Sequence, residues 1–428
     1  MFSKVSKEYL LFKKRREKLV ENIRQENSYQ KDGVVVLFAA FEDDRYAFRQ
    51  DSTFFYFTGV EEPAAVLLLY LDGREILYIP NYGESREKWM ITSLGVNKDS
   101  AKKIGVDEVK NLGQQSRGYS LSPLFLKPLY ENLLVDLGSL LSDKNKNIFG
   151  LFDLSSNNLT QVIGFQFLTS NLPGIKKVVC DISSIVYSMR RKKEKAEIDY
   201  IQRAIDITCF AYKEIAKNIN SGVLEYEIQA QLEYVFAKNK TTPAFPSIVA
   251  GGKNATILHY TKKDKKLKDG DLVVVDIGAE CRQYAADLTR TFPVGGKFND
   301  RQREVYKVVL ETQKFIENLA RPGMYLNNPK DQERSLQHIA REFLRKAGYL
   351  QYFFHGIGHF LGLDVHDVGN MAKLLECGDL ITIEPGVYIS EENLGIRIED
   401  DFLITEDGCR CLSKQLPKEL EEVEKMMR

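Results

Sequence analysis

The sequence predicts a two-domain protein, with an α/β domain over residues 1–175 and an α+β domain over residues 176–428. The first observation is length, because 428 residues exceed the roughly 250–300 at which a single core stops growing. The second is that short apolar runs alternate with helical patterns in the first part. The third is that long helical patterns precede strands in the second part, as when helices cover one face of a sheet.

The N-terminal domain is predicted from a basic helix at its start and a series of short apolar runs. These runs indicate extended segments over 34–40, 54–58, 65–71 and 75–79. Asp72-Gly73 stands between the last two, and this dipeptide between apolar runs is a strong hairpin signal. Residues 84–175 alternate helical and extended patterns. Leu172-Pro173-Gly174 and a strand over 176–181 mark the passage to the second domain.

The C-terminal domain is predicted from apolar residues at helical spacing. Helices are expected over 185–218, 226–238, 300–320 and 331–346. The basic run Arg190–Lys195 is interpreted as the solvated face of the first of these helices. Strands are expected over 272–280, 284–293, 380–385 and 395–405.

The composition argues against nucleic acid and membranes as partners. Sixty Lys and Arg residues face sixty Asp and Glu residues, so the formal net charge is zero. No run approaches the roughly 18–20 apolar residues of a membrane span. The basic N-terminus also lacks the apolar core of a signal peptide. Six scattered cysteines without a CxxC pair fit a reducing compartment, so we expect a cytoplasmic protein.

The stretch Phe354–Asp367, written FHGIGHFLGLDVHD, carries three of the five histidines of the chain. They are His355, His359 and His366. Four carboxylates lie on separate predicted strands before and after this stretch, at Asp276, Asp287, Glu384 and Glu399. Carboxylates with a single imidazole form a ligand set suited to two hard divalent cations.

The predicted strands give these carboxylates a common orientation. Side chains alternate faces along a strand, so Val273 and Val275 share one face and Asp276 takes the other. A short connection is expected to bring Asp287 back opposite Asp276. The alternative is that the acids are solvated residues of half-exposed strands. That interpretation is weaker because the acids are flanked by Val, Ile and Gly rather than by Lys and Ser.

Four neighbouring carboxylates need compensating cations to remain ionised. Two divalent ions would supply that charge and would lower the pKa of water from about 15.7 to near 7, making a bridging hydroxide available. Oxygen-rich ligands favour Mn²⁺, with Co²⁺ or Zn²⁺ as alternatives. His355 and His359 also have the spacing of a helical zinc pair. Gly356 and Gly358 disfavour a helix, however, and the Glu expected after the first His is absent.

Five motifs resemble those of a known family: ILHYT (257–261), VVVDIGAECRQYAADLTRTFPVGGKF (273–298), FHGIGHFLGLDVHDVG (354–369), LITIEPGVYI (380–389) and GIRIEDDFLIT (395–405). They are similar to those of Xaa-Pro aminopeptidases (aminopeptidase P), which share the pita-bread metallopeptidase family with prolidase and methionine aminopeptidase. Residues 46–69 resemble the N-terminal domain of the aminopeptidase P and prolidase branch. The resemblance covers nearly the whole chain and implies a C-terminal catalytic domain of pita-bread type.

The resemblance also implies a role for each candidate site residue. The metal ligands would be Asp276, Asp287, His359, Glu384 and Glu399, with Asp287 and Glu399 bridging both ions.

Other roles follow from the same resemblance. Glu384 would also pass a proton to the leaving nitrogen. His366 would stabilise the tetrahedral oxyanion. His259 and His355 would line the substrate site around the proline ring, and Arg397 would orient a ligand carboxylate.

The implied reaction is release of the N-terminal residue from peptides with proline second, through a metal-bridging hydroxide. The main alternative is a prolidase that cleaves Xaa-Pro dipeptides. Methionine aminopeptidase fits less well, because of the large N-terminal domain. A non-catalytic peptide- or protein-binding relative is a third possibility. The resemblance further suggests a homo-oligomer, dimer or tetramer, and Trp89 is a candidate for substrate or subunit contact, although a role in the core is the simpler interpretation.

Overall fold

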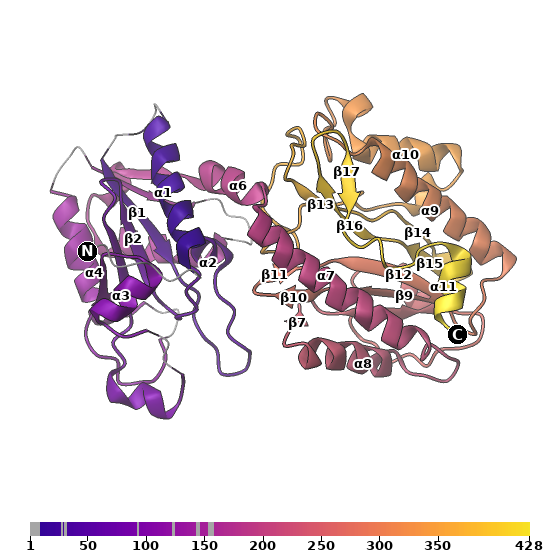
Figure 1. Cartoon of the computed structure of the whole chain (residues 1–428), viewed down its shortest axis with the longest axis horizontal. Helices are drawn as coiled ribbons and strands as arrows, with labels where there is room; N and C mark the ends of the chain where they lie inside the picture. Colours follow the sequence, from indigo (N-terminus) through magenta and orange to yellow (C-terminus); the bar gives the residue numbers. More distant parts are fainter. Residues whose placement is uncertain are drawn as a thin grey trace. The chain divides into compact units, whose positions relative to one another are not determined.

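The computed structural model describes residues 9–26, 29, 32–91, 94–121, 125–142, 146–152 and 158–428 (Figure 1). The chain divides into two compact units, Met1–Met189 and Arg190–Arg428. The division falls later than the proposed domain boundary at 175/176. The reason is that strand β6 (Val179–Asp181) still pairs with β5 (Asn147–Gly150) in the sheet of the first unit.

In its described residues, the first unit contains a mixed six-stranded sheet in the order β4-β3-β2-β1-β5-β6. Its other strands are β1 (Gly33–Phe38), β2 (Val66–Tyr70), β3 (Glu75–Ile79) and β4 (Glu108–Asn111). β2 pairs antiparallel with both β1 and β3, whereas the remaining pairs are parallel. The predicted hairpin at Asp72-Gly73 joins β2 to β3. Gly73 has φ +98°, a conformation that suits glycine.

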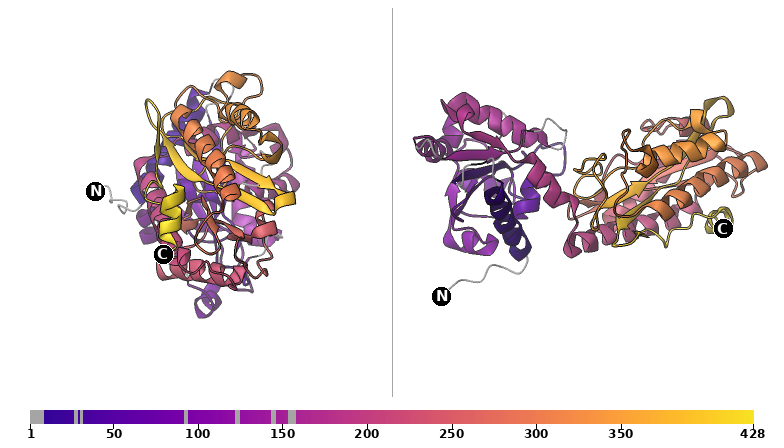
Figure 2. Two further views of the ribbon diagram at one scale, coloured as in Figure 1. Left: turned by 90° about the vertical axis from the view of Figure 1, so that its right-hand side faces the viewer. Right: turned by 90° about the horizontal axis from the view of Figure 1, so that it is seen from above.

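Helices cover both faces of this sheet (Figures 1 and 2). They are α1 (Leu10–Gln25), α2 (Ser52–Thr58), α3 (Lys98–Ile104), α4 (Glu131–Leu140) and α5 (Leu159–Asn171), and a further helix, α6 (Ser183–Arg191), follows β6 in the chain. Val34, Val36 and Phe38 of β1 form one core with apolar residues of α4 and α5. On the other side, α2 packs against β1 and α1 packs against β2.

The extended segment predicted over 54–58 is wrong, because these residues form helix α2. Asp51 caps its first turn by accepting a hydrogen bond from the backbone N–H of Phe54, and Gly59 ends it in the left-handed conformation. Every residue of α2 is buried, so its apolar run carries no helical period. Such a run cannot be distinguished from a buried strand by pattern alone.

The second unit combines small sheets with long helices (Figure 1). The strand orders are β11-β10-β7, β12-β9-β8, β13-β16-β17 and β14-β15. The strands are β7 (Thr242–Pro243), β8 (Ile248–Gly251), β9 (Leu272–Ile277), β10 (Ala279–Cys281), β11 (Tyr284–Ala285), β12 (Leu288–Pro293), β13 (Leu380–Ile383), β14 (Gly386–Ile389), β15 (Leu394–Arg397), β16 (Asp400–Ile404) and β17 (Cys409–Cys411). The strands predicted over 272–280, 284–293 and 395–405 are therefore each broken. The first is broken at Gly278, because β9 pairs with β12 and β10 pairs with β7. The break in the last occurs because β15 pairs with β14 and β16 pairs with β13.

The helices of this unit are α7 (Lys195–Ala216), α8 (Glu225–Lys238), α9 (Asp300–Leu319), α10 (Leu336–Lys346) and α11 (Leu420–Met426). α7 packs against β10, β11 and β12, whereas α9 packs against β13, β14 and β15. The helix predicted over 185–218 is two helices, α6 and α7, with a break after Arg191. Among the described residues, no helix combines the length and the apolar character needed to cross a membrane.

The interpretation of Arg190–Lys195 as a solvated face is also wrong for Arg190, Arg191 and Lys193, which are buried. Arg190 is 1% exposed, and Arg191 and Lys193 are each 6% exposed. All three cations pair with carboxylates from the C-terminal part of the chain. A charge run can therefore be internal when acidic partners distant in sequence meet it.

Candidate metal centre

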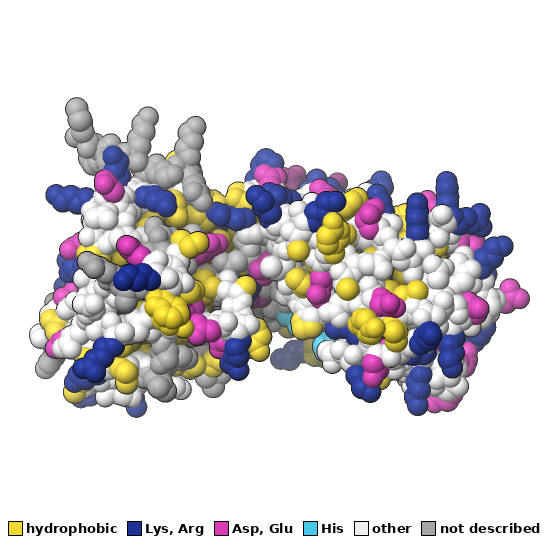
Figure 3. All heavy atoms as spheres, turned by 90° about the horizontal axis from the view of Figure 1, so that it is seen from below, with side chains coloured by type: hydrophobic (Ala, Val, Ile, Leu, Met, Phe, Trp, Pro, Cys, Tyr) yellow, Lys and Arg dark blue, Asp and Glu magenta, His cyan; other side chains and the backbone are white. Residues whose placement is uncertain are grey.

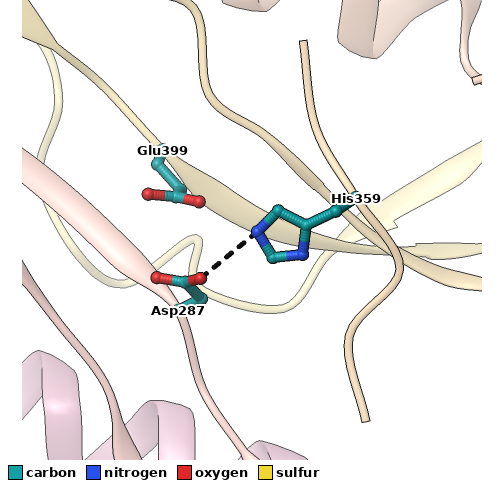
Figure 4. Close-up of side chains that lie close together, drawn as sticks. All are labelled: Asp287, His359 and Glu399. Carbon is teal, nitrogen blue, oxygen red and sulfur yellow. Dashed lines mark ion pairs between the residues drawn. The ribbon is translucent and has the colours of Figure 1, made fainter. Parts of the chain in front are cut away.

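Three side chains from separate loops of the second unit converge on one point (Figure 4). They are Asp287, His359 and Glu399, and one ligand atom of each lies within 4.8 Å of the others. Asp287 lies in the break between β11 and β12, and Glu399 lies in the break between β15 and β16. Asp287 and Glu399 are buried, and the side chain of His359 is 11% exposed. The three could hold a metal ion.

Backbone pairing between two sheets brings the acids together. The register of β9 and β12 places Thr289 opposite Asp276. Thr289 also bridges to Glu399, whose N–H donates to the Thr289 carbonyl at 3.1 Å, and the Thr289 hydroxyl donates to Glu399 Oε2 at 2.6 Å. Asp276 and Glu399 therefore flank one threonine. Asp287 lies just before β12 and is not directly opposite Asp276 as the sequence suggested.

Thr382 joins the histidine loop to the strand that precedes Glu384. Its N–H donates to the His359 carbonyl at 2.9 Å, and its hydroxyl accepts the His359 N–H at 3.1 Å. Glycine is required at Gly358, because a Cβ there would lie 2.0 Å from the Thr382 carbonyl oxygen. The result is that His359 Nε2 lies 3.5 Å from Glu384 Oε1 and 3.4 Å from Asp287 Oδ2.

The tautomer of His359 follows from its other nitrogen. Nδ1 lies 3.0 Å from the Phe360 carbonyl oxygen, which can only accept a hydrogen bond. Nδ1 therefore carries a proton in either charge state of the ring, and in the neutral ring that a cation would bind, the Nε2 lone pair faces the carboxylates. This arrangement, with a backbone carbonyl fixing the second nitrogen, is the one usual for metal-binding histidines.

The two carboxylate oxygens of Asp276 differ in their hydrogen-bond partners. Arg397 Nη2 lies 2.6 Å from Asp276 Oδ2, whereas the buried Oδ1 has no hydrogen-bond partner among the residues that the structure describes. Arg397 also donates to the hydroxyls of Tyr388 at 3.0 Å and Thr289 at 3.2 Å. Because buried polar atoms are nearly always paired, an unpaired carboxylate oxygen beside further acids fits an additional cation.

The acids raise one another's pKa. Burial and repulsion from Asp276 raise the pKa of Asp287 to about 7, despite His359. Burial, together with Asp287 and Glu384, raises the pKa of Glu399 well above its ordinary value. Burial also raises the pKa of Glu384, although His359 and Arg397 oppose this. The cluster therefore binds extra protons until cations replace them.

The remaining histidines surround this cluster. Burial and then Arg397 lower the pKa of His355 to about 3, and desolvation with repulsion from His359 and His259 lowers the pKa of His366 to about 4. Both rings are therefore neutral near pH 7. The His366 ring lies edge-on to His359 with 4.2 Å between centroids. His259 and His366 are exposed, and Figure 3 shows histidine atoms at the surface of one face of the molecule.

His355 lies on a short chain of hydrogen bonds. Its Nδ1 is 2.8 Å from the Gly356 carbonyl oxygen and its Nε2 is 3.0 Å from the Tyr388 hydroxyl. Nδ1 must donate to the carbonyl, so Nε2 accepts from Tyr388, which in turn accepts from Arg397. The chain connects His355 through Arg397 to Asp276.

Sequence reasoning missed several residues that shape this centre. Thr289 and Tyr388 were not singled out, and no local pattern marks either of them. Asp401 is buried and accepts the Asp287 N–H at 3.1 Å. Burial and then Asp287 raise the pKa of Asp401 well above its ordinary value. Its place two residues after Glu399, on the same face of an alternating strand pattern, is the signal that points to it.

Comparison with known proteins assigns the chain to a class. The model of metallopeptidase family M24 matches residues 199–406, and that of the aminopeptidase P N-terminal domain matches residues 12–118. The fold and the acidic centre thus define a metallopeptidase of pita-bread type preceded by a separate α/β domain. The Xaa-Pro aminopeptidase of Haemophilus influenzae is 34% identical over 93% of this chain and 94% of its own. The chain belongs to the aminopeptidase P family.

Two further similarities bear on function. The structure of zinc-substituted Escherichia coli aminopeptidase P in complex with product superposes with a TM-score of 0.82 at 30% identity, covering 99% of both chains. The Xaa-Pro dipeptidase of Pyrococcus furiosus is 39% identical, but over 57% of this chain and 68% of its own. The resemblance to aminopeptidase P thus extends over both units.

The raised pKa values predict how cations stabilise the protein. Asp287 and His359, with pKa values raised to about 7 and about 9, stabilise the metal-free fold at low pH, and this stability is lost as pH rises through those values. Cations favour the deprotonated forms. We therefore expect the gain in Tm on adding Mn²⁺ to chelator-treated protein to be larger at pH 8 than at pH 6.

The comparison is a difference between loaded and metal-free protein at each pH, so titration of groups outside the centre cancels. The Asp287→Asn variant is the control, because it keeps the side-chain shape and should lose most of the Mn²⁺-dependent gain at both pH values. A gain that is equal at the two pH values, or larger at pH 6, would contradict the expectation.

Proposed function

We propose that this chain releases the N-terminal residue from peptides whose second residue is proline. The observation that carries the proposal is the buried cluster of Asp287, His359 and Glu399, with Glu384 and Asp276 beside it. Membership of the aminopeptidase P family supports the choice of reaction. An Xaa-Pro bond lacks an N–H and has a constrained φ, so peptidases that bind an extended, hydrogen-bonded backbone handle it poorly.

We assign the five ligand positions to Asp276, Asp287, His359, Glu384 and Glu399. Two divalent cations, when bound there, lower the pKa of water toward about 7 and so supply the nucleophile. Two features support the fit: the unpaired Asp276 Oδ1 and the four crowded carboxylates. We propose Mn²⁺ as the metal, because carboxylate oxygens dominate the ligand set, with Co²⁺ and Zn²⁺ as the alternatives.

Glu384 is the proposed general acid and base. Burial raises the pKa of Glu384, which favours its holding a proton between two steps of a reaction. In this role it takes the proton of the attacking water and delivers it to the proline nitrogen as the bond breaks. Thr382 steadies the carboxyl group, because its hydroxyl lies 3.4 Å from Glu384 Oε1.

His366 is the proposed donor to the scissile carbonyl oxygen. With a pKa of about 4, the ring is neutral near pH 7 and has one N–H to donate. A donor aimed at the carbonyl oxygen stabilises the negative charge that develops on it. We propose that His355 and His259 line the substrate site, and that Arg397 acts by orienting Asp276.

The second candidate is a prolidase, favoured by the 39% identity to a Pyrococcus furiosus Xaa-Pro dipeptidase. An assay that compares Xaa-Pro with Xaa-Pro-Xaa separates the two. We expect the Mn²⁺-loaded protein to hydrolyse the tripeptide, chelator to abolish that activity and added Mn²⁺ to restore it. Turnover of the dipeptide alone would favour the prolidase. Failure to bind Mn²⁺ after reconstitution would favour a non-catalytic peptide-binding relative.

The compartment, the partners and the oligomeric state of the protein are further proposals. We propose a cytoplasmic enzyme that acts on peptides and has no nucleic-acid or membrane partner. We also propose that it forms a homo-oligomer, dimer or tetramer, which sedimentation of the intact chain would test. Trp89 is 68% exposed and stacks on Tyr119, so the simpler interpretation of it as a core residue is wrong.

A further inference from the structure

An ion cluster lies against the loop that carries His366. It consists of Arg190, Lys193, Asp364 and Asp367. Arg190 Nη2 lies 2.7 Å from Asp364 Oδ2 and 2.6 Å from Asp367 Oδ1. Lys193 Nζ lies 3.0 Å from Asp367 Oδ2. The side chains of Arg190, Lys193 and Asp367 are at most 2% exposed, and that of Asp364 is 19% exposed.

The loop Phe360–Asp367 closes directly onto this ion cluster. The Asp367 N–H donates to the Phe360 carbonyl at 2.8 Å, which ties the two ends of the loop together. Gly362 lies between them, and a Cβ there would be 2.1 Å from Asp367 Oδ2 and 2.8 Å from Lys193 Cε. The backbone thus passes as close to the ion cluster as glycine allows.

Each charge of the ion cluster is stabilised by an opposite charge beside it. Burial alone would raise the pKa of Asp367, but Lys193 and Arg190 lower it below its ordinary value. Taking four charges out of water is unfavourable, and it is offset only when each charge meets its partners in one good geometry. The backbone bonds could close this loop without any ions. The ion cluster therefore further restricts where the Asp367 end of the loop can lie.

His366 directly precedes Asp367 in the chain. Its ring packs edge-on to His359 at 4.2 Å. We propose that Arg190 and Lys193 are positioning residues for His366, which hold Asp367, and with it the neighbouring imidazole, where the scissile carbonyl oxygen gains charge. The inference rests on the proposed role of His366. Neither cation acts on the substrate itself.

The test is a double-mutant cycle in the full-length, Mn²⁺-loaded protein. Arg190→Gln should lower kcat on an Xaa-Pro-Xaa tripeptide by about 10- to 100-fold, the loss expected when a catalytic group moves by about 1 Å. KM should change by less than about twofold. In a His366→Ala background, the same substitution should have no further effect beyond about twofold, because the positioned group is gone. Arg190→Lys should recover part of the loss, since an ammonium keeps the charge.

Two controls separate positioning from a general loss of stability. Arg16→Gln removes a similarly buried arginine, 1% exposed and 2.8 Å from Glu75 Oε2, in the first unit. It should lower Tm without lowering kcat. Lys193→Gln is the milder second variant, because Arg190 still holds Asp367, and it should give a smaller loss with the same dependence on His366. Melting curves and bound Mn²⁺ are measured for every variant.

The possible results are distinguishable. Equal losses of kcat in the wild-type and His366→Ala backgrounds would overturn the positioning role while leaving the proposed function intact. Loss of bound Mn²⁺ in Lys193→Gln would overturn it as well, because the ion cluster would then support the metal ligands. Unchanged kcat in His366→Ala would instead refute the assignment of His366, and the positioning role would fall with it.

Discussion

Replacing Glu399 should abolish hydrolysis while the fold survives. Glu399 lies among Asp287, His359 and the Thr289 hydroxyl, and it is one of the two proposed bridging ligands. Changes around metal ligands already reduce activity about 10- to 100-fold. Loss of a ligand removes the cation itself, so we expect kcat/KM for Glu399→Gln and Glu399→Ala to fall by at least about 10³-fold. Asp287→Ala should behave in the same way.

Stability provides the complementary measurement. The metal-free Glu399→Gln protein should melt no lower than metal-free wild type, because the substitution removes a buried carboxylate whose ionisation is opposed by burial and neighbouring acids. The gain in Tm on adding Mn²⁺ should disappear. Glu391→Ala is the matched control, since Glu391 is exposed and lies nearby in the sequence. Residual activity within about tenfold of wild type in Glu399→Gln would refute the ligand assignment.

Asp276, Asp287 and Glu384 could be singled out because each is an isolated charge among uncharged residues, whereas Glu399 lies in the charged run Arg397–Asp401 and was singled out by the alternation of that run and by family resemblance. Alternation along a strand accounts for Asp276, which lies within β9. It does not account for Asp287, Glu384 or Glu399, which lie at breaks or ends of strands. Carboxylates at such breaks can turn toward one point, since the backbone there leaves the sheet. The alternation of side chains along a strand does not predict where that strand breaks.

The geometry that was missed depends on contacts between distant segments. Thr289 connects Asp276 to Glu399 only because β12 pairs with β9 on one side and bridges to residue 399 on the other. Arg190 at the end of α6 and Lys193 just after it can be buried because Asp364 and Asp367 reach them from a loop far along the chain. Neither register nor long-range pairing is encoded in the local pattern of charges. Family resemblance implied the ligand set that we propose for the centre, but it did not imply these supports.

Replacing His366 with alanine should lower kcat far more than it raises KM. A neutral imidazole that donates to the scissile carbonyl oxygen acts mainly when charge develops there, so its loss is felt in the transition state. Removal of one such donor typically reduces kcat by about 10²- to 10³-fold. We expect that range for His366→Ala on an Xaa-Pro-Xaa tripeptide, with KM changed by less than about threefold and with Mn²⁺ content unchanged.

His338→Ala is the matched control for this prediction. His338 lies on α10, where its Nδ1 is 2.9 Å from the Ser335 hydroxyl, and it has no place in the proposed reaction. Its replacement should leave kcat and KM unchanged. His366→Asn tests the chemistry further, because an amide still offers an N–H and should recover part of the lost kcat. If His366→Ala instead raised KM and spared kcat, the residue would bind substrate in the ground state, and the carbonyl oxygen would require another donor.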